Sequence, residues 1–154
     1  MEFRPASADD VRAIALLRWD ATAEDGPVAQ PRDDFAAAFV EWAHEVAATH
    51  TAFVAVDGGT VVGSAWLARI PRAPDPGMER RAHGDLQTVF VVPARRSAGV
   101  GAALIRQVLA HGWEQGLAAV TVASNERAAP LYRRLGFTGD PMDLRVAAPE
   151  RTRG

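Results

Sequence analysis

Hydrophobic and polar positions divide the 154-residue chain into segments of helical and alternating period. A short strand is expected at residues 2–4, followed by Ser7 and Asp10 at the spacing of a capping box that opens a helix. Residues 20–32 are rich in Gly, Pro, Asp and Glu, which predicts a loop. A second helix then carries large apolar residues at helical spacing, which we expect to form a buried stripe: Phe35, Phe39, Trp42 and Val46.

The middle of the chain has the pattern of a sheet. Two β-rich runs flank Asp57, Gly58 and Gly59, and the paired glycines supply the positive φ that tight hairpin turns need. Pro71–Gly84 contains three prolines and several charges, so we expect an exposed connection there. Residues 85–92 are mostly apolar, which predicts a central strand.

The last third of the chain continues this alternation. A helix is expected from about Gly99 to Gly116, where glycine stops it. After it come a central strand over residues 117–124, a short helix over Ala128–Leu135 and a last strand over Met142–Val146. The order β–α–α–β–β–β–α–β–α–β predicts a mixed α/β sheet with helices on its faces, and a single domain.

Composition narrows the possible chemistry. The chain has no cysteine, so disulfides, thiolate metal sites and cysteine nucleophiles are excluded. All 17 basic residues are arginine, which excludes a Schiff-base lysine and a Walker-type phosphate lysine. The net charge is −2 and the arginines are scattered, so we expect no nucleic-acid partner. The four histidines show no metal-ligand spacing, and we expect no metal.

The chain also shows no sign of membrane insertion or export. No apolar stretch reaches the 18 or more residues of a membrane span. The N-terminal residues are acidic and polar and lack an apolar signal core. We therefore expect a cytoplasmic protein without a membrane partner.

One candidate site lies where the central strand feeds a helix. Arg96, Gly99 and Gly101 stand directly after Val91-Val92-Pro93. A helix N-terminus offers unpaired N–H groups, and glycines let a ligand approach the backbone, so this turn is typical of an anion site. The alternative is a strand–helix turn whose glycines serve geometry alone.

A second segment follows about 30 residues later. Asn125 closes a strand, and the only tyrosine of the chain, Tyr132, lies seven residues on in a short helix that ends at Gly136-Phe137. Alone, such a tyrosine is commonly a half-buried packing residue whose hydroxyl finds a partner. In this order and at this distance, the two segments form a far more specific pattern than either one.

Together the two segments resemble the GNAT family of acetyl-CoA-dependent N-acetyltransferases. The family pattern is V-x-P followed by [RQ]-x-x-G-x-[GA], and later N-x-x-A-x-x-L-Y-x-x-x-G-F. It stands here as residues 91–93, residues 96–101 and residues 125–137. The resemblance implies one GNAT domain over residues 1–154, with a mostly antiparallel twisted sheet of six or seven strands and about four helices.

The resemblance also assigns roles for binding acetyl-CoA. Backbone N–H groups along one loop would hold its pyrophosphate: Arg96, Ser97, Ala98, Gly99, Val100 and Gly101. The backbone of Val89, Phe90 and Val91 would pair with the pantetheine arm, and the Val91 N–H would stabilise the oxyanion. Asn125 would contact the pantetheine. Tyr132 would protonate the departing thiolate as the general acid.

The residue that removes the amine proton is left open. Asp85 is the first candidate, because it stands at the start of the central strand where histone-type members carry a carboxylate; the alternative is a solvated loop end. Glu126 and His83 are further candidates, and a water chain would need no dedicated base.

In the family, the connections at residues 20–32 and 71–84 border the acceptor site. Their neighbourhood holds acidic residues that either attract a cation or are solvated loop charges: Asp25, Asp33, Asp34, Asp75 and Glu79.

The sequence therefore predicts an N-acetyltransferase that transfers acetyl from acetyl-CoA to a primary amine, small or on a peptide. The first alternative is a GNAT module that binds acyl-CoA as a sensor without turnover. The second is an unrelated α/β protein that binds no CoA. Family members are often homodimers, which leaves a homodimer open for this chain.

Overall fold

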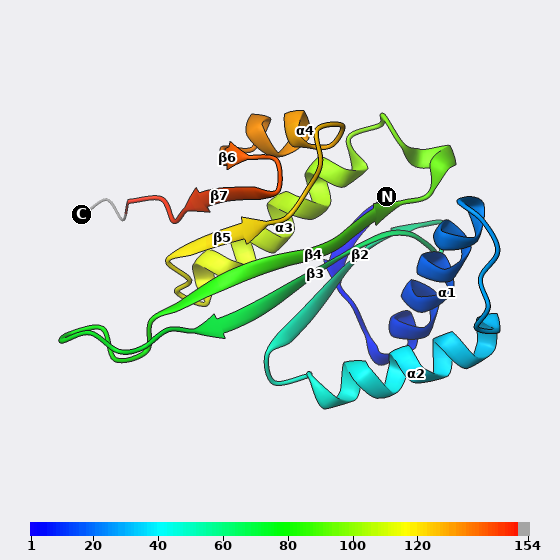
Figure 1. The fold of residues 1–154 in the computed structure, drawn as a ribbon, viewed down its shortest axis with the longest axis horizontal. Coiled ribbons are helices and arrows are strands. Elements are labelled where there is room, and N and C mark those ends of the chain that lie inside the picture. The colour runs from blue at the N-terminus through cyan, green and yellow to red at the C-terminus, as the bar shows by residue number, and fades with distance from the viewer. Residues whose placement is uncertain (151–154) are drawn as a thin grey trace.

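The computed structural model describes residues 1–150, which form one seven-stranded sheet flanked by four α-helices (Figure 1). The strands are β1 (Glu2–Pro5), β2 (His50–Asp57), β3 (Thr60–Pro71), β4 (Ala82–Val91), β5 (Ala119–Val122), β6 (Thr138–Asp140) and β7 (Asp143–Ala147). The helices are α1 (Ala8–Glu24), α2 (Arg32–Glu45), α3 (Val100–Glu114) and α4 (Ala129–Arg134). The predicted mixed α/β fold is confirmed.

Within this sheet the strands follow the order β1-β2-β3-β4-β5-β7-β6. Neighbouring strands are antiparallel except β4 and β5, which run parallel. Strand β6 was not expected, because its three exposed residues carry no alternating pattern. None of the helices in residues 1–150 combines the length and apolar character needed to cross a bilayer.

The capping box predicted at the first helix is present. One carboxylate oxygen of Asp10 accepts hydrogen bonds from the Ser7 backbone N–H at 2.7 Å and from the Ser7 hydroxyl at 2.9 Å. Arg4 on β1 donates to the same oxygen at 2.6 Å, and this pairing lowers the pKa of Asp10 to about 2. α1 continues to Glu24, past the predicted loop start at residue 20, and Asp20 in this extension pairs with Arg32 at the start of α2.

The helices cover both faces of the sheet. α3 and α4 pack on one face, over the larger core, whose best-buried members include Phe53, Leu104 and Phe137. α1 and α2 cover the other face, where Ile14 and Trp66 are buried and Phe39 packs against them. In Figure 1, α1 and α2 lie at the right, while α3 runs behind the strands.

The apolar stripe of α2 is only partly buried. Phe35, Phe39, Trp42 and Val46 each keep an intermediate exposure, and only Ala36 of this helix is fully enclosed. The prediction of a buried stripe was therefore too strong. The helix lies at the margin of the sheet, where its aromatic rings contact protein on one side and solvent on the other.

The expected connection over residues 71–84 is shorter than predicted. β3 runs to Pro71, and β4 already begins at Ala82, which is 1 % exposed. The segment between them is the tip of a long two-stranded ribbon that projects at the left of Figure 1, away from α1. Backbone pairing with β3 overrides the charged, proline-rich composition of this segment.

The centre of the sheet is split. β4 pairs with β5 only at Gly84 and Asp85, and β4 then runs on past the end of β5 (Figure 1). A bulge interrupts the pairing of β3 with β4, and Thr88 there has φ of 46°, which is unusual for a β-branched residue. The last residues of β4 therefore keep one free backbone edge.

Candidate active site

The loop between β4 and α3 exposes a row of backbone N–H groups. Ser97 and Gly99 both have positive φ, at 61° and 78°, and the helix begins at Val100. The first helical hydrogen bond is donated by Ala103 to Gly99. Within the described chain, the N–H groups from Val100 to Ala102 have no acceptor, as expected for a first helical turn. These N–H groups and the helix dipole favour an anion here.

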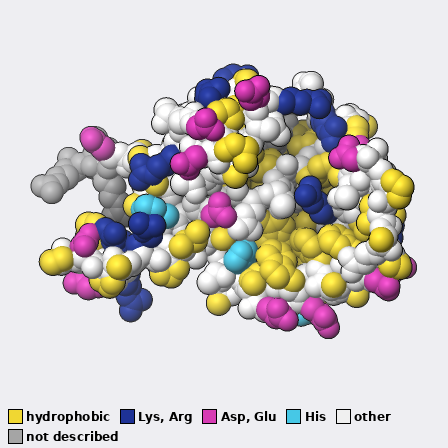
Figure 2. All heavy atoms as spheres, in the orientation of Figure 1, with side chains coloured by type: hydrophobic (Ala, Val, Ile, Leu, Met, Phe, Trp, Pro, Cys, Tyr) yellow, Lys and Arg dark blue, Asp and Glu magenta, His cyan; other side chains and the backbone are white. Residues whose placement is uncertain are grey.

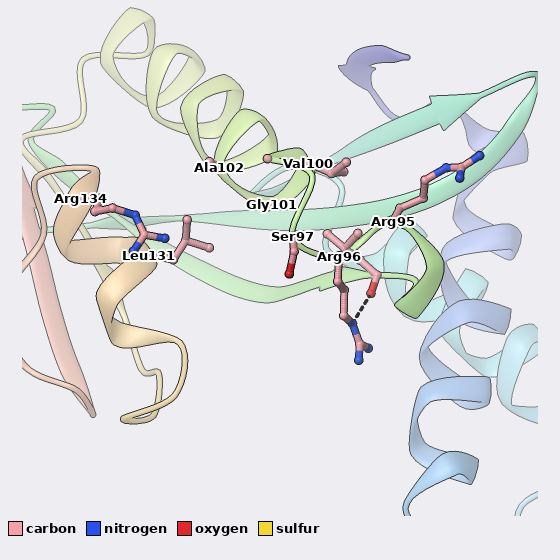
Figure 3. A pocket seen from close by; sticks show the side chains of 10 residues that line it. Arg95, Arg96, Ser97, Val100, Gly101, Ala102, Leu131 and Arg134 are labelled. Atoms are coloured by element: carbon pink, nitrogen blue, oxygen red, sulfur yellow. Dashed lines mark hydrogen bonds between the residues drawn. The ribbon is translucent and has the colours of Figure 1, made fainter.

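A cavity of about 500 Å³ lies in front of these N–H groups. Its walls come from the end of β4, the loop, the start of α3 and the facing side of α4 (Figure 3). The lining residues are Val91, Arg95, Arg96, Ser97, Gly99, Val100, Gly101, Ala102, Leu131 and Arg134. Six of the predicted cofactor-binding residues line it, whereas Val89, Phe90, Ala98 and Asn125 do not.

Arg134 is a lining residue that the sequence analysis missed. It stands one helical turn after Leu131 on α4, and Figure 3 shows both side chains directed toward the start of α3. The spacing of three places both residues on one face of a helix. That signal was present in the sequence, but it had no meaning until α4 was known to lie beside α3.

The two arginines of the loop point elsewhere. The Arg96 guanidinium donates from Nε to the Val91 carbonyl oxygen at 2.9 Å and lies over the Phe90 ring, 5.5 Å from its centroid. Arg95 is held by Asp57, with Nε 2.8 Å from the carboxylate. Figure 3 shows Arg96 extending away from the start of α3, so Arg134 is the more directly placed cation.

The Val91 N–H lies on the free edge of β4 and faces the gap between β4 and β5. The Val92 N–H bonds the Val62 carbonyl oxygen of β3 at 2.9 Å. Successive peptide groups of a strand point to opposite sides, so the N–H groups of Val91 and Val89 point away from β3. An extended ligand could add to this edge as a further strand.

Tyr132 is enclosed in the larger core. Its ring stacks edge-on against Phe137, with centroids 5.4 Å apart, and the residue is 6 % exposed. Burial raises the pKa of Tyr132 to about 12, so the hydroxyl keeps its proton at neutral pH. The hydroxyl has no hydrogen-bond partner in residues 1–150, yet it is not among the fully enclosed polar atoms.

Asn125 and Asp85 both have local partners. The Asn125 side-chain oxygen accepts from the Ala128 N–H at 2.9 Å and so caps the turn before α4, leaving only its NH₂ free for a ligand. Asp85 stands where the β4–β5 pairing ends, and its carboxylate accepts from the Gln87 side chain at 2.8 Å. It is therefore a strand residue and not the end of a loop.

The other two base candidates lie in less favourable places. His83 is also in β4, not in a loop, and burial together with the nearby arginines lowers its pKa. It lies before the paired segment of β4, on the ribbon side of the split. Glu126 is exposed in the turn before α4.

A second cavity, of about 180 Å³, lies on the other face of β4. α1, α2, β3 and the bulged part of β4 contribute its walls: Ile14, Arg18, Phe35, Phe39, Ser64, Thr88 and Phe90. Figure 2 shows hydrophobic side chains gathered around a hollow beside α1 and α2. Neither residues 20–32 nor residues 71–84 line either cavity, so their place beside the acceptor site stays a prediction.

Comparison with known proteins identifies the fold and its catalytic class. The sequence model of the Acetyltransferase (GNAT) family matches residues 12–137. The chain belongs to the GNAT acetyltransferase family. The resemblance noted from residues 91–137 is thereby confirmed.

Curated relatives of this GNAT chain include two amine acetyltransferases. Glucosamine 6-phosphate N-acetyltransferase of Trypanosoma brucei brucei is 35% identical over 57% of this chain and 58% of its own length. The N-alpha-acetyltransferase RimI of Mycobacterium tuberculosis is 37% identical over 60% of this chain and 56% of its own. The chain thus matches little more than half the length of either relative.

Solved GNAT structures share the whole fold. An acetyltransferase of Trypanosoma brucei superposes with a TM-score of 0.69 at 27% identity, covering 90% of this chain and 93% of that one. A protein of Clostridium acetobutylicum described as a predicted acetyltransferase, crystallised with acetyl-CoA, gives a TM-score of 0.72 at 13% identity, covering 90% of each chain.

Proposed function

We propose that this GNAT chain transfers the acetyl group of acetyl-CoA to the primary amine of an acceptor. The observation that carries the proposal is the row of free N–H groups at the start of α3, which faces a cavity beside the open edge of β4. The names of two relatives, acting on glucosamine 6-phosphate and on protein α-amines, support an amine as the acceptor class.

The cavity fits the phosphate end of acetyl-CoA. Gly99 supplies the left-handed residue that turns the chain into α3, and a Cβ there would have no neighbour within 4 Å. Gly101 would place a Cβ 3.5 Å from Leu131 and 3.8 Å from Val91, inside the cavity wall. The loop N–H groups and Arg134 hold the pyrophosphate, and the thioester supplies an activated acetyl group.

The free edge of β4 orients the reacting end. Val89 and Val91 bond the pantetheine arm, and the Val91 N–H donates to the thioester carbonyl as negative charge develops on it. Loss of one such donor typically costs about 10²–10³ in rate. The free NH₂ of Asn125 bonds the pantetheine while its oxygen caps the turn. Phe90 lies on the opposite side from Val91, so the acceptor enters from the second cavity.

The transfer involves two proton movements, one from the amine and one to the thiolate. A C–N bond forms as the C–S bond breaks, the amine loses one proton, and the thiolate takes one. Tyr132 serves as the donor to the thiolate. Its pKa of about 12 lies above the roughly 8.5 of a thiol, so its main contribution is a hydrogen bond to the developing charge, with net protonation from solvent.

Asp85 receives the amine proton through water. Val91 lies six positions further along the chain, which is about 20 Å along an extended strand and too far for direct contact. Asp85 lies at the end of the β4–β5 pairing, so water entering the split would reach its carboxylate. The pH dependence of Asp85→Asn tests this role: an unchanged rate profile would leave solvent water as the acceptor.

The experiment that tests the whole proposal is a calorimetric titration of acetyl-CoA, followed by thiol release with a panel of amines. The chain has no cysteine, so a thiol reagent reports only the CoA released. Saturable micromolar binding with amine-dependent release is expected. Binding without release from any amine would favour the sensor alternative, and no binding by folded protein would overturn the proposal.

A further inference from the structure

The second cavity contains a cation that has no partner. Arg18 lies on α1 and lines the cavity, and it makes no side-chain hydrogen bond or ion pair within residues 1–150. Two acidic residues of these helices are paired with other arginines: Asp20 bonds Arg32 at 2.7 Å, and Asp33 bonds Arg12 at 2.9 Å. The Arg18 guanidinium is thus free to bind an anion from outside.

No acidic side chain lines this cavity. The nearest second cation is Arg96, which lines the larger cavity and whose guanidinium lies over the ring of Phe90, a wall of the second cavity. Two positive charges without a carboxylate disfavour a polycationic acceptor. The same charges lower the pKa of a bound ammonium and so raise the fraction of neutral amine, the form that attacks a thioester.

The remaining walls are apolar and aromatic. The rings of Phe35 and Phe39 lie 5.8 Å apart, and Phe39 in turn contacts Trp66, so one end of the cavity is a firm aromatic surface. The volume of about 180 Å³ is below the roughly 300–1,000 Å³ of pockets for drug-sized ligands. The cavity therefore fits one apolar group of a small acceptor, or one terminal residue of a larger one.

We propose that the acceptor is a primary amine that carries an apolar group and a carboxylate or phosphate, and that Arg18 recognises this anionic group. The inference rests on the proposed acetyl transfer, because that function makes the second cavity the acceptor site. A guanidinium is suited to both anions, since its planar donors match either one in a two-pronged contact.

The test measures acceptor binding apart from turnover. Protein saturated with CoA is titrated with phenylalanine and phenylalaninamide, with tyramine phosphate and tyramine, and with spermidine. Each pair keeps the amine and the ring and changes only the anionic group. We expect the anionic member of at least one pair to bind 10- to 100-fold more tightly than its neutral partner, as for a charged hydrogen bond. The pair that responds distinguishes carboxylate from phosphate.

Arg18→Gln is the variant, and Arg12→Gln is the matched control on the same helix, outside both cavities. Arg18→Gln should remove the preference for the anionic ligand, in binding and in kcat/KM, and leave the affinity for the neutral partner within about 2-fold. Arg12→Gln should keep the preference. Both positions are exposed, so folding should persist in each variant.

Several outcomes would overturn the inference. Equal binding of both members of each pair, no binding of either anionic amine, or tighter binding of spermidine would each do so. A preference that survives Arg18→Gln would remove Arg18 as its source. These results differ from failure of the proposed function, which shows as absent CoA binding in the first step of the same titration.

Discussion

The two cavities on either side of β4 are built in opposite ways. The larger one is made mainly by backbone from one continuous stretch, residues 91–102, with Leu131 and Arg134 closing it. The smaller one is made by side chains from four separate elements, such as Arg18 from α1 and Phe90 from β4. Backbone N–H groups suit a phosphate that is the same for every member of a family, whereas side chains can differ and select the acceptor.

Gly101→Val should have the largest effect, and it should change ligand binding only in the larger cavity. A Cβ at this position meets Leu131 and Val91 at ordinary contact distance, so the fold survives while two further methyl groups occupy the cavity. We expect acetyl-CoA affinity to fall at least 100-fold in calorimetry, with an unchanged thermal midpoint. Gly101→Ala is the control and should lose far less. Normal acetyl-CoA affinity in the valine variant would contradict the assignment of residues 96–101 as the phosphate-binding loop.

Tyr132→Phe should separate chemistry from binding. The ring and its contact with Phe137 remain, and only the donor to the thiolate is lost. We expect kcat to fall about 10- to 100-fold, with the Kd for acetyl-CoA within 3-fold. The wild-type enzyme should show no alkaline loss from Tyr132 near pH 10, because the donor is lost only as pH rises through its raised pKa of about 12. An unchanged kcat removes Tyr132 as the acid.

Arg134→Gln tests the one cation that α4 brings to the larger cavity. Acetyl-CoA should bind about 10-fold more weakly, and the difference should shrink at high salt as the charge is screened. The neighbouring Arg133→Gln is the control, because Arg133 donates to the Gly139 carbonyl oxygen at 3.2 Å and lies outside the cavity. Equal losses in both variants would indicate a general charge effect.

Phe35→Ala should give the reverse pattern to Gly101→Val. Phe35 is half-buried in the smaller cavity, so its loss removes apolar contact with the acceptor and little of the core. We expect the acceptor KM to rise about 3- to 10-fold, as for roughly 1 kcal/mol of lost burial, with CoA affinity unchanged. A change in CoA affinity without a change in acceptor KM would show that the two cavities are not separate sites.

Asp10→Asn is a distant control that should change stability alone. The pKa of Asp10 is lowered to about 2 by Arg4 and by the hydrogen bonds from Ser7, so these contacts together stabilise the fold at pH 7 by about 2 kcal/mol. A lowered folded pKa means that this contribution is complete above the unfolded pKa near 4 and is lost as pH falls through 2. Denaturant unfolding of both proteins should show the difference at pH 7 and its disappearance near pH 2.

Some predictions from sequence failed where pairing overrode composition. The proline-rich segment up to Gly84 was expected to be a loop, yet Ala82 and Gly84 are buried in β4 because β3 supplies their partners. His83 lies in β4 and not in a loop for the same reason, whereas Asp85 lies in the strand that the sequence predicted. The stripe on α2 was correctly placed on one helix face, but a helical period does not reveal how far the sheet extends beneath that face.

What the sequence by itself determined is the backbone-based half of the site. A strand, a turn with Gly99 and Gly101, and a helix are local features, so their order in the chain already implies free N–H groups at the helix start. Only the tertiary structure decided what faces them: Arg134 beside that start, and Arg18 with Phe35 and Phe90 across β4. The reason is physical, because distant side chains meet only once the split between β4 and β5 and the packing of α1 and α2 have fixed their positions.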